Sequence, residues 1–186
     1  MNSLLIYGAN GYSAKLILNE LLKFNIKPIL AGRNKKEIIE IAENYKLDYK
    51  IFDLENFELI VENLKGIHTL INCAGPFIFT AKELIEACLI TKTNYLDITG
   101  EIPVLSLAYK YSEKAKENNI TILPAVGFDI IPTDCLAKKL KEKYPNAYEL
   151  KLSLITINSK ISRGTLLTSI EFLSGKSKIL KDGKII

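Results

Sequence analysis

The sequence predicts an α/β fold in which helices flank a doubly wound parallel sheet with the strand order 3-2-1-4-5-6. Six short apolar runs alternate with stretches whose apolar residues recur at helical spacing, and the connections between them are short. A glycine turn follows the first run, as in a dinucleotide-binding (Rossmann) sheet. Right-handed crossovers make this strand order the natural one for such an alternation.

The first strand, turn and helix supply the predicted cofactor site. Ser3–Tyr7 has the pattern of a strand, and the helical period begins at Tyr12. The first N–H groups of a helix lack intrahelical partners and favour negative charge, so a pyrophosphate can sit there where glycines let it approach. A plain turn between strand and helix is the alternative for so short a motif. The predicted cofactor residues of this turn are Gly8, Ala9, Asn10, Gly11, Tyr12 and Ser13.

The later strands of the sheet are predicted at Pro28–Ala31, Tyr49–Phe52, Thr69–Cys73, Asn94–Ile98 and Ile120–Val126. A helix over Thr133–Tyr144 closes this first domain, which we expect to span residues 1–148. Residues 149–186 have the pattern of an incomplete second domain, with a strand at Glu149–Ile157, a helix ending near Gly175, and a hairpin turn at Lys181–Lys184. Because only Ile185 and Ile186 follow that turn, we expect the chain to stop inside the second domain.

Composition places the chain among ordinary globular proteins, with 48% hydrophobic and 25% charged residues in 186. The net charge of +4 comes from 25 basic and 21 acidic residues scattered along the chain, which argues against nucleic-acid binding. Three cysteines without paired spacing favour a reducing compartment, and the N-terminus lacks the pattern of a signal peptide. No apolar run reaches the roughly 20 residues of a membrane span, so we expect a cytoplasmic protein.

Five motifs occur in a fixed order along the chain: GANGYSA at residues 8–14, AGR at 31–33, NCAGPF at 72–77, YLDITGE at 95–101 and VGFDIIPTDCLA at 126–137. In this order they resemble the saccharopine dehydrogenase-like family, close to its trans-acting enoyl reductase branch. The resemblance implies an NADP-binding Rossmann domain followed by a larger substrate and dimerisation domain, which SRGT at 162–165 would open. Where the family usually has glycine, this chain has Ala14, Ala81 and Lys92.

Arg33 is the predicted determinant of cofactor choice. Sites that prefer NAD carry an acidic residue about 20 residues past the glycines, which binds the ribose 2′-hydroxyl. Here that position holds Arg33, whose guanidinium matches the oxygens of a 2′-phosphate, and two of the 25 basic residues are arginines. The alternative is a solvated charge at the start of a helix. The sequence therefore predicts NADP.

The loop after the fourth strand is predicted to lie beside the pyrophosphate and the nicotinamide ribose, because the fourth strand neighbours the first. A tight turn that needs its glycine and proline is the alternative. Asp53, after the third strand, is predicted to contact the adenine edge or, as an equal alternative, to cap a helix. The predicted cofactor residues of the fourth-strand loop are Asn72, Cys73, Ala74, Gly75 and Pro76.

Candidate catalytic groups lie at the end of the fifth strand and after the fifth and sixth strands. Asp97 and Thr99 alternate and therefore share a face of the fifth strand, and Glu101 follows them. Glu101 could instead be satisfied by the N-terminus of the next helix, and Asp129 and Thr133 could cap the last one. We select Asp97, Glu101 and Asp129 as catalytic candidates.

Two functional classes remain open from the sequence. The first is an NADPH-dependent oxidoreductase that acts on a small-molecule or lipid-like substrate, with a homodimer as a candidate assembly and this chain as its cofactor-binding part. The second is a non-catalytic NADP-binding sensor or scaffold, and a non-functional remnant is a third reading. A metal site is not predicted, because His68 is the only histidine and opens a strand at the far edge of the sheet.

Overall fold

The computed structural model describes residues 3–128, 130–153, 155, 157, 163–173, 180–181 and 184–185. The strands are β1 Leu4–Tyr7, β2 Ile29–Gly32, β3 Tyr49–Ile51, β4 Thr69–Asn72, β5 Asn94–Asp97, β6 Ile122–Leu123, β7 Leu180–Lys181 and β8 Lys184–Ile185. The helices are α1 Tyr12–Lys23, α2 Lys35–Tyr45, α3 Phe57–Leu64, the 3-10 turn η1 Phe77–Phe79, α4 Ala81–Thr91, α5 Ile102–Lys110, α6 Ser112–Glu117, α7 Ile131–Lys143 and α8 Arg163–Leu173.

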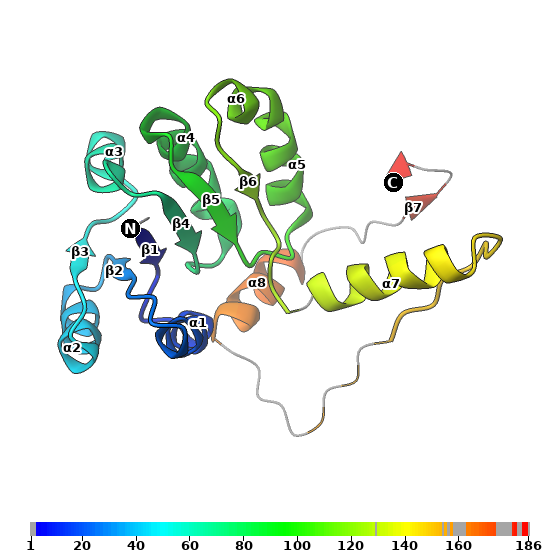
Figure 1. The fold of residues 1–186 in the computed structure, drawn as a ribbon, viewed down its shortest axis with the longest axis horizontal. Coiled ribbons are helices and arrows are strands. Elements are labelled where there is room, and N and C mark those ends of the chain that lie inside the picture. Colours follow the sequence, from blue (N-terminus) through cyan, green and yellow to red (C-terminus); the bar gives the residue numbers. More distant parts are fainter. Residues whose placement is uncertain are drawn as a thin grey trace.

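Six parallel strands form one sheet in the order β3-β2-β1-β4-β5-β6, which confirms the predicted fold class and strand order. Figure 1 shows α1 and α2 on one side of the sheet and α3, α4 and α5 on the other. This distribution follows from right-handed crossovers, because the chain moves from β1 toward one edge and then returns to build the other. The carboxyl ends of β1, β2 and β4 consequently meet at one edge of the sheet.

The central strand β1 is buried on both faces. Leu5 pairs with β2 and β4, and both Leu5 and Ile6 are fully buried. Leu5 belongs to the core that includes Leu84 of α4, whereas Ile6 belongs to the core that includes Leu18 of α1 and Ile38 of α2. A strand covered on both sides is a continuous apolar run, and this is the pattern at the start of the sequence.

The helix ends follow local sequence chemistry. Asn34 and Asn56 each cap the helix that follows, accepting the N–H of Glu37 and Leu59, respectively. Lys92 ends α4 in the left-handed conformation with φ of 56°, which explains why glycine suits this position in the family that the sequence resembles.

Two elements of the six-stranded sheet and its flanking helices differ from the predictions. The sixth strand is confined to Ile122–Leu123, inside the predicted Ile120–Val126. The helical stretch expected between the fifth and sixth strands is divided at Tyr111, where α5 ends before α6 begins. The backbone at Tyr111 has φ of −90° and ψ of 2°, which departs from the α-helical ψ and separates the two helices.

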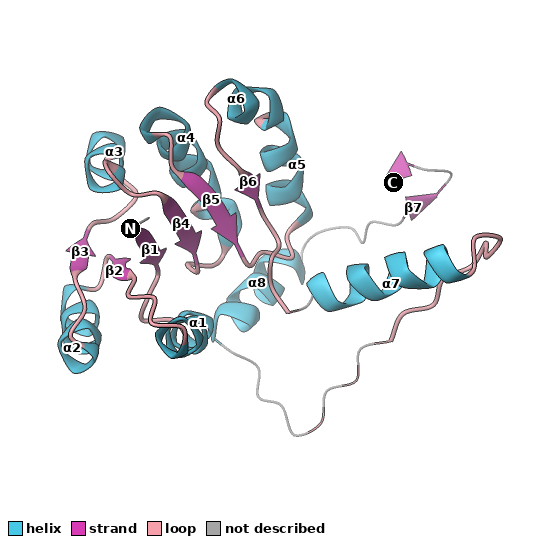
Figure 2. Cartoon of the chain, in the orientation of Figure 1, coloured by secondary structure: helices cyan, strands magenta, loops and turns pink. Residues whose placement is uncertain are grey.

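Residues 149–186 differ more strongly from the prediction. The predicted strand at Glu149–Ile157 is wrong for its described residues, which form an irregular segment (Figure 2). Their side chains are exposed. Alternation alone does not make a strand, because an extended segment needs a neighbour to pair its backbone groups. The predicted helix is present as α8, and the predicted hairpin is present as β7 and β8, with Leu180 opposite Ile185.

The last helix after the sheet, α7, begins at Ile131 and extends away from the sheet (Figure 1). None of its residues is buried, and Ile131, Leu136 and Leu140 are exposed apolar side chains on it. Among the described residues, no helix combines the length and the apolar character that a membrane crossing would need.

Candidate functional site

One cavity of about 870 Å³ lies at the carboxyl ends of β1, β2 and β4. It brings together the glycine loop, the residues after β2, Asp53 and the loop after β4. All but two of the predicted cofactor residues line it, and the exceptions, Ala9 and Asn72, are buried beside it. This volume is within the usual range for small-molecule sites, about 300–1,000 Å³.

Gly8 and Gly11 shape the turn between β1 and α1. Gly8 has φ of 77°, and a Cβ there would lie 2.9 Å from the backbone N of Ala74. The N–H of Gly11 donates to Gly8 O at 2.9 Å, and Gly11 is the N-cap of α1, so no side chain caps this helix. The first turn of α1 therefore presents its N–H groups to the cavity, as a phosphate site requires.

Arg33 and Asp53 line the cavity on the side of β2 and β3, and both are exposed. Tyr7 lines the same cavity, and its hydroxyl donates to Phe52 O at 3.3 Å. Burial raises the pKa of Tyr7 to about 12. The positive charge of Arg33 lowers this pKa by a smaller amount, and the negative charge of Asp53 raises it. Asp53 accepts the N–H of Glu55 and does not cap α3, because Asn56 holds that position.

The loop after β4 is held by a buried polar network. Asn72 Nδ2 donates to Tyr95 Oη at 3.2 Å and to Thr80 Oγ1 at 3.0 Å, while Asn72 Oδ1 accepts the N–H of Ala74. Thr80 Oγ1 in turn donates to Ala74 O at 2.8 Å, and the Gly75-Pro76 peptide bond in this loop is cis. Asn72 therefore fixes the conformation of this loop from a buried position that does not line the cavity.

Cys73 is the thiol in this loop, and it is only partly exposed. Burial raises its pKa to about 12, and the nearby Asp97 carboxylate adds to the effect. The side chain is a neutral thiol at neutral pH. It can contact a ligand but is not an activated nucleophile.

Asp97 lies behind the cavity and does not line it. Its carboxylate is fully buried and accepts the Tyr95 hydroxyl at 2.8 Å, the N–H of Thr99 at 3.0 Å and the N–H of Ala125 at 2.8 Å. Burial raises the pKa of Asp97, while these three hydrogen bonds oppose the rise. Its oxygens bind neighbouring strand ends and loops.

Glu101 is also buried, with 3% exposure, and does not line the cavity. It does not cap the helix that follows it; its two oxygens accept the N–H groups of Phe77 and Ile78 at 2.9 and 2.8 Å. Glu101 therefore holds the turn η1 that follows the loop after β4. The third catalytic candidate, Asp129, lies outside the described residues.

Helix α8 reaches the same cavity from the far end of the chain. Gly164 and Leu167 contribute to its lining, and Thr168 Oγ1 lies 3.4 Å from Glu101 Oε1 as a hydrogen-bond donor. Residues that follow the six-stranded sheet by about 40 positions thus form part of the cavity lining.

Several residues that the structure places in or under the site were not predicted from the sequence, and Tyr7, Glu37, Thr80 and Tyr95 are among them. The spacing of Asn34 and Glu37, an N-cap with an acidic residue three positions later, could have indicated Glu37. Tyr95 lies two positions before Asp97 and therefore on the same face of the strand, so the alternation of the strand could have indicated it. Tyr7 and Thr80 carried no comparable local signal.

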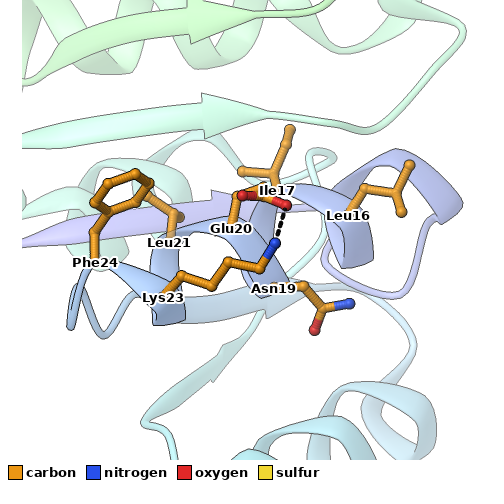
Figure 3. A pocket seen from close by; sticks show the side chains of 7 residues that line it. All are labelled: Leu16, Ile17, Asn19, Glu20, Leu21, Lys23 and Phe24. Atoms are coloured by element: carbon orange, nitrogen blue, oxygen red, sulfur yellow. Dashed lines mark hydrogen bonds and ion pairs between the residues drawn. The ribbon is translucent and has the colours of Figure 1, made fainter.

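A second hollow lies along the outer surface of α1 (Figure 3). Its lining comes from this one helix, and its charged side chains, Lys23 and Glu20, pair with each other at 2.7 Å. Because no polar groups from other elements converge there, it lacks the chemistry of a catalytic or cofactor site.

The cavity at the sheet edge fits a dinucleotide phosphate. Side chains at Gly8 or Gly11 would crowd the loop, since a Cβ at Gly11 would lie 3.2 Å from Gly8 O. The uncapped N-terminus of α1 supplies N–H donors, and Arg33 supplies a cation after β2.

Comparisons with known proteins agree with this geometry. A family model described as the saccharopine dehydrogenase NADP binding domain matches residues 4–123. A saccharopine dehydrogenase-like oxidoreductase of Bos taurus is 27% identical over 96% of this chain and 47% of its own length. A putative trans-acting enoyl reductase of Mycobacterium tuberculosis is 24% identical over 94% of this chain and 45% of its own.

A solved structure of apo saccharopine dehydrogenase (L-Glu forming) from Saccharomyces cerevisiae superposes with a TM-score of 0.67 at 17% identity, covering 77% of this chain and 31% of that one. At this identity the superposition shows the shared Rossmann fold. The chain spans about half the length of the curated relatives it matches. Because the family model covers well over half of the chain, the chain belongs to the saccharopine dehydrogenase NADP-binding domain family and binds NADP.

Proposed function

We propose that this chain is the cofactor-binding part of an oxidoreductase that transfers a hydride to a C=C or C=N acceptor. The observation that carries the proposal is the convergence of the α1 N-terminus, Arg33 and the loop after β4 on one cavity. Bound NADPH supplies the hydride, and the protein orients it and its acceptor. A C=C acceptor is supported by the similarity to the mycobacterial putative trans-acting enoyl reductase.

In this proposal each part of the cavity has one task. The N–H groups of the first turn of α1, beside Gly8 and Gly11, bind the pyrophosphate. Arg33 binds the 2′-phosphate, and Asp53 lies beside the adenine. Cys73–Pro76 contacts the nicotinamide ribose, with its shape set by Asn72.

A catalytic role for Asp97, Glu101 or Asp129 stays a prediction. The hydrogen bonds of Asp97 and Glu101 favour positioning roles, because their oxygens are buried and hold backbone N–H groups. Among the described residues near the loop after β4, the polar side chains that face the cavity are Cys73 and Thr80. We therefore expect this chain to bind NADPH without oxidising it, since an acceptor needs orientation and a group aimed at developing charge.

The experiment measures NADPH binding by nicotinamide fluorescence and NADPH oxidation against a panel of enoyl, imine and aldehyde acceptors. We expect binding without oxidation by the chain alone, and oxidation after fusion to a second domain of the family type. Oxidation by the chain alone that is lost in Asp97→Asn or Glu101→Gln would contradict the expectation. Binding without turnover in both forms would favour a non-catalytic sensor or scaffold.

We further infer that residues 149–186 begin a substrate or dimerisation domain. The support is that α8 contributes Gly164 and Leu167 to the cofactor cavity, where an acceptor would have to lie. A lipid-like substrate, a homodimer and a cytoplasmic location remain predictions. The free state of Cys73, Cys88 and Cys135 is compatible with a reducing compartment.

A further inference from the structure

Glu37 occupies a position between the glycine loop and the loop after β2. Its Oε2 accepts Asn10 Nδ2 at 2.9 Å, and its Oε1 accepts Asn34 Nδ2 at 2.5 Å. It lies in the first turn of α2 and lines the same cavity as Arg33. Two amides from two different loops therefore fix this carboxylate at the mouth of the cofactor site.

The charges around this part of the cavity are unbalanced. Among the described lining residues, Arg33 is the basic side chain, whereas Glu37, Asp53 and Glu55 are acidic. A ribose 2′-phosphate brought to Arg33 would also approach the carboxylate of Glu37 and be repelled by it. A ribose 2′-hydroxyl could instead donate a hydrogen bond to a carboxylate.

Capping of α2 does not account for this arrangement. The N–H of Glu37 donates to the side chain of Asn34, which is an ordinary N-cap contact. The bond from Asn10 is not part of a cap, because Asn10 belongs to the turn that precedes α1 and lies 27 positions earlier in the chain. It ties the phosphate-binding turn to the first turn of α2, which follows the loop that carries Arg33.

We propose that Glu37 is a second determinant of cofactor selectivity, which acts against Arg33 by disfavouring a 2′-phosphate and accepting a 2′-hydroxyl. The chain thus discriminates NADPH from NADH less sharply than it would with Arg33 alone. This inference rests on the proposed placement of the adenosine ribose beside Arg33.

The test compares Glu37→Gln with wild type for NADPH, NADH, adenosine 2′,5′-bisphosphate and 5′-AMP, using calorimetry. Removing one charge a few ångströms from the phosphate should raise the ratio of NADPH to NADH affinity about three- to tenfold, with the same change for the two adenosine nucleotides. Glu40→Gln, the same charge change at an exposed position on the same helix, should leave both ratios unchanged. The gain in Glu37→Gln should shrink at high salt, which a purely structural effect would not do.

The outcomes separate this inference from the proposed function. Unchanged ratios in Glu37→Gln, or equal weakening of all four ligands, would overturn the role of Glu37 while leaving the cofactor site in place. Failure of the folded wild type to bind NADPH or NADH would overturn the proposed function, and the inference with it. Urea unfolding of each variant shows that the comparison is made between folded proteins.

Discussion

Gly8 and Gly11 constrain the cofactor loop for different reasons. Gly8 has a positive φ, and an added Cβ would clash with the backbone of Ala74, so both conformation and space require glycine. Gly11 has an extended backbone, with φ of −69° and ψ of 159°, which any residue can adopt. Only the 3.2 Å approach to Gly8 O limits Gly11, so it offers the cleaner probe of cofactor binding.

Gly11→Val should abolish NADPH binding while the protein stays folded. Its side chain would occupy space at the N-terminus of α1, where the pyrophosphate is expected. The close approach to Gly8 O should lower the free energy of unfolding by about 1–3 kcal/mol, the usual range for overpacking. Nicotinamide fluorescence and urea unfolding measure the two effects. Binding that persists in the folded variant would show that the pyrophosphate lies elsewhere.

Arg33 should make NADPH bind at least about tenfold more tightly than NADH, because a charge-assisted hydrogen bond contributes roughly 1.5–3 kcal/mol. Arg33→Ala should remove most of this preference. The matched control is Lys139→Ala, which removes a positive charge from the exposed helix α7. Fluorescence titration with NADPH and NADH measures the two affinities for each variant. A preference for NADPH that persists in Arg33→Ala would show that Arg33 does not bind the 2′-phosphate.

At the scale of elements, side chains near the carboxyl ends of β4 and β5 are joined by one buried polar network. Asp97 receives the N–H of Ala125, a non-glycine residue with φ of 61°, and the hydroxyl of Tyr95. Tyr95 in turn accepts from Asn72, which holds the loop after β4. The position of the cofactor loop thus depends on strand ends that do not line the cavity.

Asp97 should give the protein a measurable pH dependence of stability. Burial raises its pKa above the ordinary 3.8, so the folded state holds this proton to a higher pH than the unfolded state. The stabilising contribution is therefore present at low pH and is lost as pH rises from about 4 through the folded pKa. The free energy of unfolding of wild type should fall over this range relative to Asp97→Asn, as urea unfolding at several pH values would measure.

The control for this prediction is Asp48→Asn, which removes the same charge at an exposed position. Its difference from wild type should show no comparable slope with pH. A difference between wild type and Asp97→Asn that stays flat, or rises with pH, would mean that the folded state does not raise the pKa of this carboxyl.

At the scale of the whole molecule, the six-stranded sheet and its helices enclose a buried apolar core, whereas the described residues after Tyr148 leave many apolar side chains exposed. Leu150, Leu152, Ile155 and Ile157 are exposed, and so are Leu166, Leu167 and Ile170 of α8. Large contiguous apolar surfaces are unusual on monomeric proteins and favour association.

The 186-residue chain should therefore self-associate, whereas a chain that ends at Tyr148 should remain monomeric. Light scattering over a range of concentrations measures both. A double substitution, Ile155→Asp with Ile157→Asp, should reduce association of the full chain without removing α8. A monomeric full-length chain would show that the exposed residues do not drive contact between copies.

The sequence determined the sheet and the place of its cofactor site. Strand and helix periods are local properties, and handedness of the crossovers then leaves one natural strand order, with β1 beside β2 and β4. Because the carboxyl ends of these strands meet at one edge, the glycine loop, Arg33 and the loop after β4 converge there. The structure brings these predicted residues together for that reason.

The tertiary structure decided what each polar side chain contacts. Asp97 and Glu101 were selected because one ends β5 and the other follows it, yet packing turns both carboxylates inward onto backbone N–H groups. The bond between Asn10 and Glu37 joins residues 27 positions apart, which no local pattern specifies. Glu149–Ile157 alternates like a strand but forms none in its described residues, because pairing depends on a neighbouring strand and not on the segment itself.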